Sequence, residues 1–219
     1  MDKYDSQKID YQLHIDSGYY NTLDIEGFSR MMKDPSYCYK FYWLEAIVQL
    51  ISEDRKDASY DEIINEMISN AWYSVLEFHV HLSGISGDGE IKDSLEKAVS
   101  KLHKLSDLSS NASKVEIKNK IAEYDKELHG EKMTLTQNVP YKALSGFANR
   151  YSERIDLNSS AGRMMAYYNR INGIESPLPY TFGDQKGLER KIIFHESWIK
   201  MIQDNMVAIL GWIQYEKVR

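Results

Sequence analysis

Glu77, His79 and His81 are the residues whose types best fit metal chemistry, because carboxylates and imidazoles are common ligands of zinc. On a helix, however, residues two positions apart point about 200° away from each other. His79 and His81 could therefore share an ion only if the helix had ended before them, and the chain has no His-Glu-x-x-His motif. We predict no metal site and interpret the pair as structural or surface residues.

Nucleophilic catalysis finds little support in the sequence. Cys38 is the single cysteine, it lies between two tyrosines without an identifiable base, and no Gly-x-Ser-x-Gly motif is present. Gly84 and Gly87 do not form a phosphate-binding loop, since no Gly-x-x-x-x-Gly-Lys-Ser/Thr motif occurs. We find no complete catalytic motif and predict no cofactor, which leaves open whether a larger parent protein is an enzyme.

An aromatic segment at 37–43 holds five rings in seven residues around Lys40. One interpretation is a binding surface, in which the rings stack on bases while Lys40 meets a phosphate. The other interpretation places Phe41 in the core and uses Tyr39 and Tyr42 to brace neighbouring helices. We favour the core.

Basic side chains are unevenly distributed along the chain. Residues 1–139 contain 16 basic and 25 acidic residues, whereas residues 140–219 contain 11 basic and 8 acidic ones. A local excess of lysine and arginine can contact phosphates, although the same side chains can pair with nearby carboxylates or simply face solvent. Our candidate nucleic-acid contacts are Lys40, Lys142, Arg150, Arg154, Arg163 and Arg170.

Helical periodicity places these residues on a largely α-helical scaffold. Apolar side chains recur every three or four residues, and two capping boxes, Ser59 to Glu62 and Ser113 to Glu116, predict helix starts. Pro140 suits the first turn of another helix. The helices we expect cover about 23–32, 41–51, 60–81, 90–108, 114–128, 141–152 and 159–170, with a long spine from about 184 almost to the end.

Length and composition set the remaining expectations. The chain has 219 residues, a 42% hydrophobic content and four prolines, which favours a helical globular protein. We predict a polar arm at 1–20 and one all-α domain of about seven to eight helices at 21–219, with a weak subdivision near 129–139. The chain shows no secretory signal and no run of about eighteen apolar residues, and its single cysteine suits a reducing compartment, so we expect a cytoplasmic protein without membrane contact.

Three segments together resemble a family of bacterial proteins in which a helical N-terminal region precedes an HNH endonuclease domain. They are YKFYWL at 39–44, AWYSV at 71–75 and VPYKAL at 139–144. Two departures are Ser74, where the family usually has proline, and Lys142-Ala143, where it has an arginine and an aromatic residue. The histidine base, asparagine and metal ligands of an HNH site are missing from this chain.

The resemblance implies a helical DNA-binding or regulatory domain that is not itself catalytic, with DNA and a C-terminal nuclease domain as its partners. The alternative is a protein-interaction or homo-oligomerisation module without nucleic-acid contact.

Overall fold

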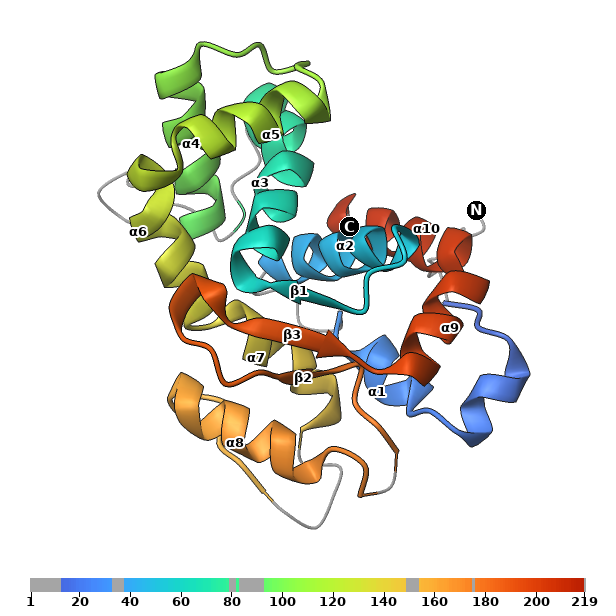
Figure 1. Ribbon diagram of the computed structural model, residues 1–219. Helices are drawn as coiled ribbons and strands as arrows, with labels where there is room; N and C mark the ends of the chain where they lie inside the picture. Colours follow the sequence, from blue (N-terminus) through green and yellow to red (C-terminus); the bar gives the residue numbers. More distant parts are fainter. Residues whose placement is uncertain are drawn as a thin grey trace, which may run out of the picture.

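A computed structural model describes residues 13–32, 38–78, 82, 93–148, 154–174 and 176–218 of the protein. Its centre is the pair formed by α2 (Tyr39–Ser52) and α3 (Tyr60–Glu77), which pack along each other (Figure 1). Both helices are buried over most of their length; Trp43 and Ile63, for example, are fully inaccessible. A helix that is apolar nearly all round is stable only inside a protein, which explains why α2 lies at the centre.

Both predicted capping boxes are confirmed. The Ser59 hydroxyl accepts a hydrogen bond from the backbone N–H of Glu62 (3.1 Å), and the Glu62 carboxylate accepts one from the backbone N–H of Ser59 (2.7 Å). Ser113 and Glu116 form the same reciprocal pair at the start of α5. These local signals fix the helix starts because each side chain satisfies an otherwise unpaired backbone donor.

The chain continues as three helices that cover one end of α3 (Figure 1). They are α4 (Ser94–Ser106), α5 (Lys114–Glu123) and α6 (Asp125–Thr136). The predicted helix over 114–128 is therefore two helices that meet at Tyr124.

The opposite end of the molecule is built from short elements. Pro140 lies in the first turn of α7 (Val139–Lys142), as predicted, and a 3-10 helix, η2 (Ala143–Phe147), follows directly. The helix α8 (Ala161–Ile171) matches the helix predicted at 159–170. Before them in sequence come a 3-10 helix, η1 (Ser17–Asn21), and α1 (Ile25–Arg30), while residues 1–12 of the predicted polar arm lie outside the described part.

The predicted long C-terminal spine helix is wrong. Residues 180–194 instead form two strands, β2 (Tyr180–Phe182) and β3 (Lys191–Phe194), which make an antiparallel sheet of order β1-β3-β2 with β1 (Asp57–Ser59). The side chains of β3 alternate between exposed and buried, which is the two-residue period of a strand. Two helices follow, α9 (Glu196–Asp204) and α10 (Met206–Val218), separated at Asn205.

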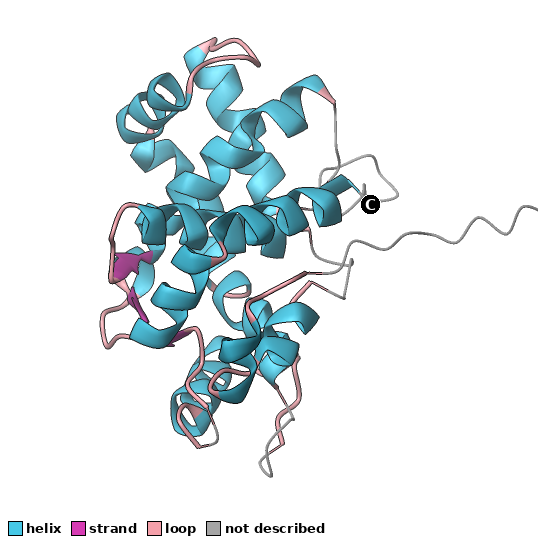
Figure 2. Ribbon diagram, turned by 90° about the vertical axis from the view of Figure 1, so that its right-hand side faces the viewer, coloured by secondary structure: helices cyan, strands magenta, loops and turns pink. Residues whose placement is uncertain are grey.

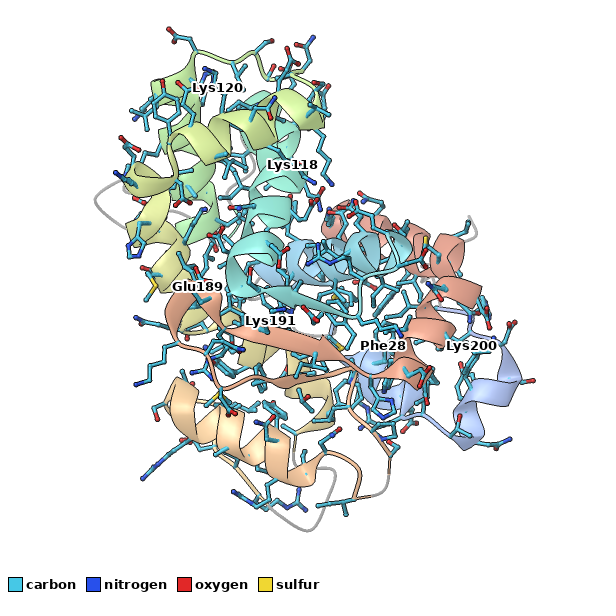
Figure 3. The ribbon with its side chains drawn as sticks, in the orientation of Figure 1. Phe28, Lys118, Lys120, Glu189, Lys191 and Lys200 are labelled. Carbon is cyan, nitrogen blue, oxygen red and sulfur yellow. The ribbon has the colours of Figure 1, made fainter. Side chains whose placement is uncertain are left out.

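Helices nonetheless dominate, which confirms the predicted all-α class, and the sheet is a small addition (Figure 2). An aromatic group ties α1 to the C-terminal helices: Phe28 lies 5.3 Å from Trp198 and 5.8 Å from Trp212 between ring centroids. Phe28 is enclosed, whereas Lys120 and Lys200 project from the outside of the molecule (Figure 3). No helix in the described ranges has the length and apolar character needed to cross a bilayer.

Candidate nucleic-acid interface

The helix α8 carries the clearest cationic face among the predicted contacts. Its inner side buries Met164, Tyr167, Tyr168 and Ile171, and this spacing makes the helix amphipathic. Arg163 and Arg170 lie on the exposed side, and residues 161–171 include no aspartate or glutamate. The outer face of α8 thus carries two arginines and no carboxylate of its own.

Side-chain contacts fix α8 against the sheet. Asn169 pairs with Phe182 of β2 twice: its amide nitrogen donates to the Phe182 carbonyl (3.3 Å), and its amide oxygen accepts from the Phe182 N–H (3.2 Å). Arg190 reaches from the segment before β3 to the Gly183 carbonyl (2.5 Å) and to the Met165 sulfur (3.1 Å). These contacts set which face of α8 turns outward.

The other predicted basic residues fall in three different environments. Lys40 is only 3% exposed and donates to the Ser145 hydroxyl (3.2 Å), so it braces α2 against η2 instead of facing a ligand. Lys142 is half-buried at the end of α7, and Arg154 is exposed in the segment that leads to α8. Arg150 lies outside the described residues.

The aromatic segment belongs to the core. Tyr39, Phe41, Tyr42 and Trp43 are all buried, and Tyr37 lies outside the described residues. The interpretation that these rings form a binding surface is therefore wrong for the four described rings, because their faces are covered by protein.

The basic excess of the back half comes entirely from one continuous segment. Residues 139–174 contain five basic and two acidic residues, whereas residues 175–219 contain six of each. This segment forms α7, η2 and α8, at the end of the molecule opposite to α4 and α5 (Figure 1). The fold thus places this basic segment at one end of the molecule.

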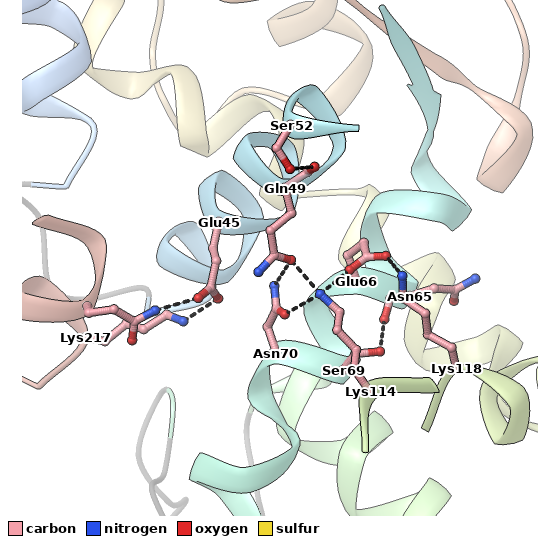
Figure 4. A network of polar contacts seen from close by, with 11 residues as sticks. Glu45, Gln49, Ser52, Asn65, Glu66, Ser69, Asn70, Lys114, Lys118 and Lys217 are labelled. Carbon is pink, nitrogen blue, oxygen red and sulfur yellow. Dashed lines mark hydrogen bonds and ion pairs between the residues drawn. The ribbon is translucent and has the colours of Figure 1, made fainter. Parts of the chain in front are cut away.

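A second charged region, which sequence reasoning missed, joins α2, α3 and α5 (Figure 4). The Lys114 ammonium contacts the Glu66 carboxylate (2.6 Å), the Gln49 side-chain oxygen (2.7 Å) and the Asn70 side-chain oxygen (3.0 Å). Lys118, one turn further along α5, pairs with the same carboxylate. Because both lysines share the Glu66 carboxylate and Lys114 also reaches Gln49 and Asn70, these contacts hold α2, α3 and α5 together.

Lys132 is the most deeply buried cation of the described chain. Its side chain is 0% exposed, and its ammonium meets Asp61 of α3 (2.9 Å) and Asp125 of α6 (2.5 Å). A buried charge is tolerated only when it is paired in this way. Lys132 lies beyond the predicted helix at 114–128, and nothing in the sequence indicated that it would be buried.

A set of buried tyrosine hydroxyls links the sheet to the central helices. Tyr180 accepts a hydrogen bond from the Trp43 indole N–H (3.1 Å) and donates to the Pro140 carbonyl (2.6 Å). The hydroxyls of Tyr60 and Tyr141 are 3.0 Å apart. Burial raises the pKa of both Tyr60 and Tyr180 well above that of a free phenol, so neither can serve as a general acid or base near neutral pH.

Within the described part of the chain, no group of three or more His, Cys, Asp or Glu side chains could hold a metal ion. His79 and His81 lie outside that part, so the predicted absence of a metal site at this pair stays a prediction. No protein-family model matches the chain, and searches of curated proteins and of solved structures found no similar protein.

Proposed function

We propose that this chain is a non-catalytic helical module that binds DNA through the outer face of α8, as the helical part of an HNH-type nuclease. The observation that carries the proposal is an exposed helical face with Arg163 and Arg170 on it and no carboxylate anywhere on the helix. Arginine binds phosphate through several N–H donors at once and keeps its charge at any physiological pH.

A titration of the whole chain against duplex DNA at low salt, followed by gel shift, tests the proposal. We expect Arg163→Glu combined with Arg170→Glu to weaken binding at least tenfold, because two attractive contacts become repulsive. Lys97 and Lys104 on α4 are the matched control: they too are exposed and seven residues apart on one helix. Their double reversal to glutamate changes net charge by the same amount and should leave affinity nearly unchanged.

Two outcomes would count against DNA binding at α8. One is that the wild-type chain fails to bind at low salt. The other is that the α4 reversal weakens binding as much as the α8 reversal, since only net charge would then matter.

Association with another protein is the second candidate function, and the exposed apolar residues favour it. Val207 on α10 is 88% exposed, and Tyr73 and Phe78, at the end of α3, form an exposed edge-to-face pair with centroids 5.4 Å apart. Exposed apolar groups of this kind occur at protein interfaces. Light scattering of the wild-type chain and of Val207→Glu tests for self-association; a concentration-independent monomer mass for both would argue against it.

A further inference from the structure

We draw no further inference here: the strongest candidate, the exposed apolar side of α10 around Val207, carries nothing beyond the second candidate function because nothing in the structure shows what covers it.

Discussion

Lys217, near the end of α10, and Glu45, in the middle of α2, form an ion pair although their side chains are only 10% and 8% exposed. Gln214 donates to the other oxygen of Glu45 (2.6 Å), and the Lys217 ammonium lies 4.2 Å from the centre of the Tyr42 ring. Burial lowers the pKa of Lys217, and the Glu45 carboxylate partly opposes that shift. The charged end of α10 is thus fixed to the central helix of the molecule (Figure 4).

Glu45→Gln should lower the free energy of unfolding by about 3 kcal/mol, because it leaves the Lys217 ammonium buried without its counter-charge. Urea denaturation measures the change. Glu45→Leu combined with Lys217→Met removes both charges and should cost less than Glu45→Gln alone. Lys200→Met, which breaks an exposed pair with Asp204, is the control and should leave the denaturation midpoint unchanged. A midpoint for Glu45→Gln equal to that of the wild type would show that the pair does not stabilise the fold.

High pH should unfold the protein through its buried tyrosines. Burial raises the pKa of Tyr42 to about 12, and it raises the pKa values of Tyr60, Tyr168 and Tyr180 further. Above pH 10 the unfolded chain loses phenol protons that the folded chain retains, so the contribution of these tyrosines to stability is constant up to about pH 10 and then falls as pH rises.

Lys217 acts in the opposite direction, because its lowered pKa makes stability rise as pH approaches the ordinary lysine pKa. The four tyrosines together change the stability more than the one lysine does, so the net effect above pH 10 is a loss of stability. Urea midpoints between pH 7 and pH 11.5, read together with tyrosinate absorbance, test this. Ionisation of all tyrosines near pH 10 with the helical signal intact would contradict it.

Tyr168→Phe should stabilise the protein by about 1 kcal/mol. The Tyr168 hydroxyl is buried and has no hydrogen-bond partner among the described residues, so the native structure bears the cost of removing that group from water. Tyr180→Phe is the contrasting variant, because it removes a hydroxyl with two partners and should cost about 2 kcal/mol. Thermal denaturation of the two variants should therefore shift in opposite directions. A decrease in stability for both would mean that the Tyr168 hydroxyl is satisfied.

Gly146→Ala should destabilise the protein by about 2 kcal/mol, because α1 and η2 pack with their backbones in contact at this position. A methyl group on Gly146 would overlap the Gly27 carbonyl oxygen and lie 2.7 Å from the Met31 nitrogen. Gly130→Ala in α6 is the matched control: nothing lies within 4 Å of the added methyl there, and alanine favours a helix interior by about 1 kcal/mol. Chemical denaturation should separate the two variants by about 3 kcal/mol, and equal midpoints would contradict the close contact.

The features that the sequence predicted well are those decided within one turn of helix. The two capping boxes and Pro140 in the first turn of α7 involve residues at most three positions apart, so the pattern contains the whole interaction. The helical class follows in the same way from apolar spacing. The exposure of Arg163 and Arg170 also has a local origin, because Met164, Tyr167 and Ile171 define the opposite face of the same helix.

The errors concern residues whose environment is set by distant parts of the chain. Leu188 and Ile192, four residues apart, fit a helical stripe, yet β3 forms because Asp57 to Ser59 pair with it from a distant part of the sequence. The sequence did contain one signal against a helix here, the glycine at 187. In the structure Gly187 has a φ of 59°, a backbone angle that an α-helix does not contain. Lys40 was placed at the surface because its neighbours gave no indication that Ser145, 105 residues away, would cover it.

The two hydrogen bonds between the Asn169 side chain and the Phe182 backbone have a consequence for how the protein behaves at high concentration. β2 is an edge strand, and an unprotected edge can recruit a strand from another molecule and start aggregation. The Asn169 amide occupies the donor and the acceptor that Phe182 would otherwise offer, as a neighbouring strand would. At the other edge, β1 is only three residues long, and the Asp57 carboxylate is held by Lys191 (2.8 Å). The outward-facing donor and acceptor of Phe182 are thus already occupied, and β1 offers only a three-residue edge to another strand, which limits polymerisation through the small β element of this mostly helical protein.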